Sequence, residues 1–368
     1  RQDRDRVSAG REIWYGEGVG ARAARALLSP ASWLFGLGVQ RRARRFEQTA
    51  DAGNASSLPV LSLGNLTVGG TGKTPLAAWA AAALRARGAT PAIVMRGYGD
   101  DEPLVHARLN PEVAVIVDAD RVRGAIQARN AGADCVILDD GFQHRQIARV
   151  SDWVLIAAER WRDDLRLLPA GPLREPLHAL GRANVIVVTR KSATRATAEE
   201  ISSRLGARFP RAGVAICHLA LDALVDARSG ERRPLSWLAD RRVVGVAAVG
   251  EPAAFFAQLR DIGARLDERA FRDHHAFDAA DVAELATDLA RREGVVCTLK
   301  DAVKLAPLWP ANAMPLWYVS QIAVIERGDA VLDRALEAVL AGRQAVISTA
   351  GPAGQSSLPN GHRSSTAD

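Results

Sequence analysis

The sequence predicts an α/β fold with a mostly parallel sheet, helices on both of its faces, and a second, smaller α/β domain. Short apolar runs of strand length recur, among them 58–65, 113–117 and 135–140, and stretches with helical spacing separate several of them. Strands that alternate with helices imply right-handed crossovers and parallel pairing. A glycine-rich loop, "GNLTVGGTGKTP" at 64–75, joins the first strand to an Ala- and Leu-rich helix.

The same patterns divide the chain into segments. Residues 1–28 read as a flexible leader, and 29–56 as a helical region suited to a membrane interface. The first α/β domain covers 57–194, and the strand pattern restarts in a smaller α/β domain over 195–342. Residues 343–368 are rich in Ser, Gly and Pro and are predicted to be a disordered tail.

Composition narrows the choice of function without deciding it. The 368 residues carry a net charge of +6, which suits phosphate ligands, nucleic acid or anionic lipid. The basic residues are scattered and form no stripe interleaved with aromatic side chains, so nucleic-acid binding is not expected. The three cysteines stand singly within apolar runs, which argues against a zinc site or a disulfide framework.

The segment "SPASWLFGLGVQRRARRF" is predicted to form a helix with Ser29 as N-cap and Pro30 in its first turn. Trp33, Leu34 and Leu37 fall on one side, and four arginines follow. That pattern fits a helix lying in a membrane interface, with arginines on anionic headgroups. A helix packed on its own domain fits equally well. The uncharged part is too short to span a bilayer.

The glycine-rich loop meets the end of the P-loop pattern G-x-x-x-x-G-K-[ST], but Thr67 stands where the first glycine belongs. Glycines inside the loop still let backbone N–H groups approach phosphate oxygens. Lys73 would lie on the β- and γ-phosphates of ATP, and the Thr74 hydroxyl on Mg²⁺. The residues predicted to bind the nucleotide are Gly69, Gly70, Thr71, Gly72, Lys73 and Thr74.

The run "CVILDDGFQHR" supports a nucleotide site, because a strand that ends in a carboxylate can reach the magnesium shell. Asp139 and Asp140 are both candidates for that role. Adjacent carboxylates repel each other unless cations or hydrogen bonds compensate. Alternatively, Asp140 simply caps the turn that follows.

One alternative is a P-loop ATPase of the partitioning or metal-insertion type, which couples hydrolysis to a protein partner. The loop of the partitioning class carries an extra lysine directly before its glycine pair, and this chain has Val68 there. The missing lysine counts against that class.

Several motifs then point in one direction: "GNLTVGGTGKTP", "RGYG", "DDEP", "DRVRGA", "ILDDGFQHR" and "LLPAGPLREP", followed by "VGEPAAFFAQL", "FRDHHAF" and "TLKDAVKL". In this order they resemble the tetraacyldisaccharide 4′-kinase family, from about Ser29 to Leu305. The resemblance implies a peripheral enzyme on the cytoplasmic face of the bacterial inner membrane. It would use ATP and Mg²⁺ to phosphorylate the 4′-hydroxyl of a tetraacylated glucosamine disaccharide 1-phosphate in lipid A biosynthesis, without an obligate protein partner.

The resemblance also implies roles for individual residues. Asp101 and His274 match the pair that acts as base on the acceptor hydroxyl, as a carboxylate–imidazole pair can. Lys73 and Arg174 would neutralise phosphate charge at the catalytic centre. The set implied for magnesium is Thr74, Asp139, Asp140 and Glu175. Weaker candidates, near the sugar or the nucleotide, are Asp120, Arg121, Gln143 and His144, and the last three are assigned to the sugar substrate.

This chain departs from the family pattern at "RGYGDDEP", where two motifs that are usually separate are fused. The glycine that precedes the acidic residue in the family is Asp100 here. We assign the catalytic position to Asp101, because "DEP" then keeps its register.

Overall fold

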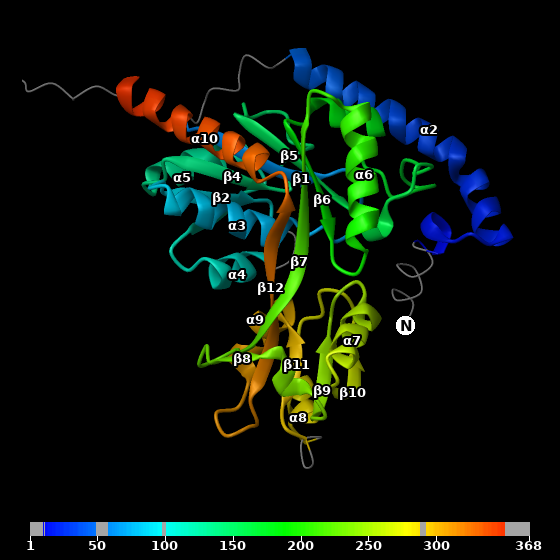
Figure 1. Cartoon of the computed structure of the whole chain (residues 1–368), viewed down its shortest axis with the longest axis vertical. Coiled ribbons are helices and arrows are strands. Elements are labelled where there is room, and N and C mark those ends of the chain that lie inside the picture. Colours follow the sequence, from blue (N-terminus) through cyan, green and yellow to red (C-terminus); the bar gives the residue numbers. More distant parts are fainter. Residues whose placement is uncertain (1–9, 11, 49–57, 98–100, 288–291, 350–368) are drawn as a thin grey trace, which may run out of the picture.

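The computed structural model describes residues 10, 12–48, 58–97, 101–287 and 292–349, which form two lobes on one continuous sheet (Figure 1). The strands are β1 (Val60–Asn65), β2 (Pro91–Met95), β3 (Ala114–Val117), β4 (Cys135–Asp139), β5 (Ser151–Ala157), β6 (Val185–Arg190), β7 (Gly213–Asp226), β8 (Arg232–Pro234), β9 (Arg242–Ala247), β10 (Arg265–Ala270), β11 (Val295–Thr298) and β12 (Leu316–Arg327). The helices are α2 (Val19–Gln48), α3 (Lys73–Ala86), α4 (Asp101–Leu109), α5 (Arg121–Asn130), α6 (Arg195–Arg208), α7 (Pro252–Asp261), α8 (Ala279–Thr287), α9 (Leu299–Leu305) and α10 (Asp329–Thr349).

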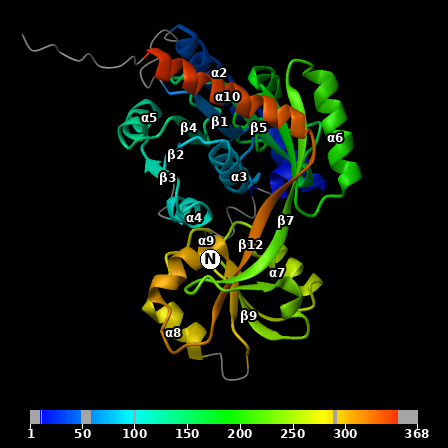
Figure 2. The ribbon, with the colours of Figure 1, turned by 60° about the vertical axis from the view of Figure 1, so that its left-hand side comes forward.

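The strands lie in the order β10-β9-β11-β12-β7-β6-β5-β1-β4-β2-β3, with β8 beside β7. Within the described residues, neighbouring strands are parallel except where β7 pairs with β12 and with β8. The long strands β7 and β12 run side by side from one lobe into the other (Figures 1 and 2). The predicted α/β fold with a mostly parallel sheet is therefore confirmed.

Helices cover both faces of the sheet in each lobe. In the first lobe, Leu61 and Leu63 of β1 pack toward α3 and α10, whereas Val136 and Leu138 of β4 pack toward α5 on the opposite face. Successive side chains of a strand point to opposite faces, so these continuous apolar strands fill two cores. In the second lobe, α7 packs on one face and α8 with α9 on the other.

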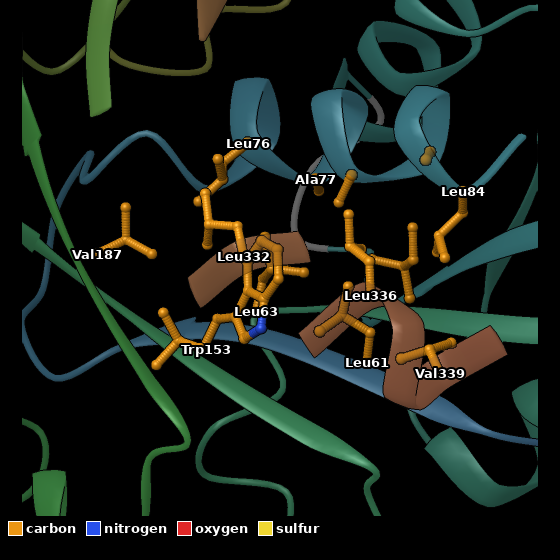
Figure 3. Close-up of a cluster of buried hydrophobic side chains, with 14 of the residues drawn as sticks. Leu61, Leu63, Leu76, Ala77, Leu84, Trp153, Val187, Leu332, Leu336 and Val339 are labelled. Atoms are coloured by element: carbon orange, nitrogen blue, oxygen red, sulfur yellow. The ribbon is translucent and has the colours of Figure 1, made fainter. Parts of the chain in front are cut away.

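Helices α6 and α10 belong to the core of the first lobe, although both begin within the range expected for the smaller domain, 195–342. Ile201 of α6 is buried against β5 and β6. Leu332 and Leu336 of α10 lie between α3 and the sheet (Figure 3). The chain leaves the first lobe through β7 and returns through β12, so its last helix packs beside its first strands. The lobes therefore do not follow the expected division of the sequence.

The N-terminal helix α2 begins at Val19 and passes through Pro30, so the start predicted at Ser29 is wrong. Proline inside a helix costs about 3 kcal/mol, and contacts on both sides of it offset that cost here. Before the proline, Nη1 of Arg25 donates to the backbone oxygens of Ile13 and Gly16, which precede α2. After it, Ser32 Oγ donates to and accepts from the loop that follows β5.

The chain ends are described only in part. Of the leader predicted for 1–28, residues 1–9 and 11 lie outside the described part of the chain, as do 49–56 of the interfacial region. Helix α10 continues to its last residue at 349, inside the predicted tail, and 350–368 lie outside the described residues. None of the described helices is long and apolar enough to cross a bilayer.

The burial of α10 gives a stability test. Leu336 is fully buried, and we expect Leu336→Ala to lower the free energy of unfolding by about 2–5 kcal/mol, because it opens a cavity between α10 and the sheet. Urea unfolding measures the loss. Leu308→Ala, at a side chain that is 42% exposed, is the control and should cost much less. Equal, small losses in both variants would show that α10 is not part of the core.

Candidate active site

The loop between β1 and α3 has the backbone geometry of a phosphate site. Gly69 (φ 112°) and Gly72 (φ 83°) adopt left-handed conformations that favour glycine. Gly72 stands directly before α3, whose first two residues are Lys73 and Thr74. Unpaired N–H groups and the positive end of the helix dipole meet at such a terminus, which suits an anion. The loop is thus built as a P-loop despite Thr67.

Asn65, the last residue of β1, contacts the charged side chains of Lys73 and Arg174 next to this loop. Its Oδ1 lies 3.3 Å from Nζ of Lys73, which in turn lies 3.4 Å from Oδ1 of Asp140. Arg174 donates two parallel hydrogen bonds to the Asp140 carboxylate, at 2.9 and 2.8 Å, and a third to the backbone oxygen of Asn65 at 3.1 Å. Gln143 Nε2 donates to the same oxygen at 3.0 Å. Five residues from four segments therefore form one network.

The two neighbouring carboxylates have different partners. Burial alone would raise the pKa of Asp140, but hydrogen bonds from Arg174 and the charges of Lys73 and Arg174 outweigh it, so the pKa falls well below its usual range. Asp139 instead places Oδ2 2.8 Å from Nε2 of His106, which is fully buried on α4. Its Oδ1 is buried and has no hydrogen-bond partner among the described residues. The expected repulsion between the carboxylates is compensated separately at each.

An acid and a histidine meet where the two lobes touch. Asp101 is the first residue of α4 and is 3% exposed, and its Oδ1 lies 3.2 Å from Nδ1 of His274 in the second lobe. His274 is a non-glycine residue in the left-handed region (φ 56°), a conformation that surrounding structure must hold. Its side chain remains 43% exposed. Of the two acids in the fused motif, Asp101 is the one with a described contact to His274, and Asp100 lies outside the described residues.

The residues predicted to hold the sugar substrate lie in the first lobe, at the start of α5 and on the turn that follows β4. Arg121, the buried first residue of α5, donates from Nη1 to a backbone oxygen of the preceding turn at 2.7 Å. The pKa of His144 falls to about 4, because burial and the nearby charges of Arg121, Arg42, Arg149 and Arg96 disfavour its protonated form. A neutral imidazole among arginines marks a strongly positive surface, which suits an anionic ligand.

Two predicted residues have other partners. Glu175 accepts a hydrogen bond from Nη2 of Arg182 at 2.9 Å, and that guanidinium also lies 4.4 Å from the centre of the Phe142 ring. Asp120 caps α5 by accepting from two backbone N–H groups. Within the part of the chain that the structure describes, no group of three or more His, Cys, Asp and Glu residues could hold a metal ion. The place of Glu175 among the magnesium ligands stays a prediction.

The structure adds functional residues that the sequence analysis did not single out. Asn65 had a weak signal, since it is the last residue of a strand that enters a P-loop. His106 had none, because a histidine on an amphipathic helix is not distinctive. Glu102 lies beside the site as well. Burial raises the pKa of its carboxyl, against the opposing charge of Lys300, whose Nζ is 3.6 Å away in the second lobe.

Comparison with known proteins agrees with this geometry. A family model described as "Tetraacyldisaccharide-1-P 4'-kinase" matches residues 24–341. The tetraacyldisaccharide 4'-kinase of Halorhodospira halophila is 36% identical over 327 residues, which cover 83% of this chain and 90% of that protein. The chain belongs to the tetraacyldisaccharide 4′-kinase family. Its membership confirms the prediction of a kinase and decides against the alternative of a P-loop ATPase that drives a protein partner.

Two further relatives extend the comparison of this kinase. The tetraacyldisaccharide 4'-kinase of Anaeromyxobacter dehalogenans is 40% identical over 315 residues, 77% of this chain and 82% of that protein. A crystal structure of LpxK from Aquifex aeolicus in complex with ATP matches with a TM-score of 0.66 and 25% identity, over 86% of this chain and 99% of that one. The P-loop of this chain therefore lies in a fold that binds ATP in that protein.

The environment of His144 gives a pH test. Its pKa of about 4 lies below the ordinary 6.5, so the unfolded chain binds more protons between these values, and stability should fall as pH falls from 6.5 to 4. His144→Gln should remove this part of the pH dependence in unfolding experiments. Proton NMR of the imidazole, assigned with the same variant, should show no titration above pH 5. A midpoint at or above 6.5 would contradict the described environment.

Proposed function

We propose that this protein transfers the γ-phosphate of ATP to the 4′-hydroxyl of a tetraacylated glucosamine disaccharide 1-phosphate, a step of lipid A biosynthesis. The observation that supports it most directly is the pair formed by Asp101 and His274, 3.2 Å apart, which joins the second lobe to the P-loop lobe. A P-loop ATPase that only hydrolyses ATP needs a positioned water. A kinase needs a group that receives the proton of an acceptor hydroxyl.

On the nucleotide side, Lys73 and the loop glycines bind the phosphates, and Asp140 with Asn65 keeps the lysine in place. Magnesium is usually held in such sites by one or two carboxylates together with substrate phosphates. The buried, unpartnered Oδ1 of Asp139 fits that role, and the Thr74 hydroxyl at the start of α3 is a second oxygen for it. When bound, the ion neutralises charge that develops between the β- and γ-phosphates.

On the acceptor side, His274 is half exposed and Asp101 is buried. With Nδ1–H donating to Asp101, Nε2 is the nitrogen that takes the proton of the 4′-hydroxyl as its oxygen attacks the γ-phosphorus. Asp101 orients the imidazole and stabilises its charged form. Arg121 and the arginines around His144 supply the positive surface for the acceptor's 1-phosphate.

The reaction is tested by following labelled γ-phosphate from Mg·ATP into the disaccharide in detergent micelles. We expect Asp101→Ala and His274→Ala each to lower the rate by on the order of 10²–10⁴, because both remove the same proton acceptor. The double variant should be about as slow as either single variant, since the two residues act as one unit. Lys73→Ala is the control, because it should abolish transfer by weakening the contact with the phosphates of ATP and leaves the Asp101–His274 pair unchanged.

Two results would contradict the assignment. Wild-type protein that binds ATP and leaves the lipid unlabelled would overturn the acceptor. A double variant much slower than either single variant would mean that the two residues serve different steps.

Attachment to the cytoplasmic face of the inner membrane is the further part of this proposal, and α2 supports it. Trp33 (66% exposed), Leu34 (63%) and Leu37 (44%) lie on the side of the helix away from buried Arg25 and Ser32. One face of α2 therefore packs on the protein, while the apolar face points outward. Exposed arginines follow on the next turns, as on helices that lie in an anionic interface. The substrate's acyl chains would then stay in the bilayer.

We expect the double variant Trp33→Glu/Leu37→Glu to bind vesicles of anionic phospholipid at least about tenfold more weakly, because membrane affinity depends on the apolar area that inserts. Cosedimentation measures the change. Leu308→Glu, at an exposed apolar residue of the second lobe, is the matched control and should bind as wild type does. Unchanged binding of the double variant would assign the face to another role.

A further inference from the structure

Arg160 lies against the P-loop on the side opposite to Asp140. In the sheet β1 is flanked by β4 and β5, and Asp140 follows β4 while Arg160 follows β5. A Cβ built on Gly69 would clash with Nη1 of Arg160, so the bare backbone at this position leaves room for the guanidinium. The guanidinium of Arg160 therefore lies against the backbone of the loop at Gly69.

The same guanidinium also reaches the second lobe. Its Nη2 donates to Oε1 of Glu251 at 2.5 Å, and Glu251 stands directly before α7. The side chains of Arg160 and Glu251 are 19% and 45% exposed. Ion pairs between side chains as exposed as these contribute little to stability. The ion pair is better explained by the position that it gives to Arg160. It holds the guanidinium beside Gly69, the third residue of the eight-residue P-loop.

The transferring phosphoryl group needs positive charge on its outer oxygens, and an arginine there accelerates P-loop enzymes by on the order of 10³–10⁵. A planar guanidinium donates parallel hydrogen bonds to phosphate oxygens. Lys73 and Arg174 already bind Asn65 and Asp140 on the β4 side of the loop. Arg160 supplies a cation from the β5 side.

We propose that Arg160 binds the γ-phosphate of ATP and stabilises its transfer, and that Glu251 of the second lobe holds the guanidinium for this task. The inference rests on the proposed kinase function. During transfer the bond from the γ-phosphorus to the bridging oxygen of ADP breaks, and the bond to the acceptor oxygen forms. The hydroxyl proton passes to the Asp101–His274 pair. Arg160 exchanges no proton and contributes charge and hydrogen bonds only.

One consequence concerns the coupling of the two substrates. Glu251 and His274 both belong to the second lobe, the first positioned toward the nucleotide and the second toward the acceptor. The placement of that lobe which brings the base to Asp101 therefore also brings Glu251 to Arg160. One boundary between the lobes therefore positions both the groups that act on the nucleotide and the groups that act on the acceptor.

The first experiment measures binding and needs no acceptor. Calorimetry compares ADP with an ATP analogue whose γ-phosphate cannot be transferred, on wild type, Arg160→Gln and Arg160→Lys. We expect Arg160→Gln to weaken the analogue about tenfold and ADP little, with lysine intermediate. Arg204→Gln, which removes a guanidinium from exposed ion pairs of the same lobe, is the matched control and should change neither. Equal losses for both nucleotides, or no loss, would overturn the proposal.

The second experiment measures transfer. We expect Arg160→Gln to lower kcat at least about 10²-fold and Glu251→Gln about tenfold, with thermal midpoints close to wild type. The double variant should be no slower than Arg160→Gln alone, because Glu251 acts through Arg160. Additive losses would overturn the role of Glu251. If wild type leaves the disaccharide unlabelled, the proposed function fails, while the binding experiment still decides whether Arg160 contacts the γ-phosphate.

Discussion

The carboxylate of Asp140 connects the parts of the nucleotide site, since it accepts two hydrogen bonds from Arg174 and lies 3.4 Å from Nζ of Lys73. Among the described residues it is one of three non-glycine residues in the left-handed region (φ 56°). The end of β4, the start of α3 and the loop that carries Arg174 are thereby joined at one point. The orientation of Lys73 depends on that junction, so the phosphate site does as well.

The second lobe completes the site from the other side. It contributes His274 to Asp101, Lys300 to Glu102 and Glu251 to Arg160, and each contact joins a polar side chain of one lobe to one of the other. Helix α4 packs against α9 at the same boundary. In the proposed reaction the first lobe supplies the P-loop that binds the nucleotide, whereas transfer to an acceptor requires both lobes in contact.

Whether a feature of the fold or the site could be predicted depends on how far apart in the sequence its residues lie. The P-loop and the parallel strands are local patterns, and the sequence predicted them. The pair of Asp101 and His274 spans 173 positions, so it was found through motif resemblance and not through spacing. His106 carries no local pattern that distinguishes it from other helix residues, and the only signal at Asn65 is its place at the end of the strand that enters the P-loop. Pro30 was read as a helix start, because tertiary contacts that tolerate an interior proline are invisible in a sequence window.

The path of β7 and β12 makes most of the second lobe one continuous insertion in the chain. The chain enters the second lobe along β7 and comes back along its antiparallel neighbour β12, so residues 227–315 are topologically an insertion into a nucleotide-binding unit. A tight hairpin turn could join the two strands without disturbing the sheet or the return of α10 to its core. The insertion contains Glu251, His274 and Lys300, so one continuous stretch of the chain makes the three contacts between the lobes described above.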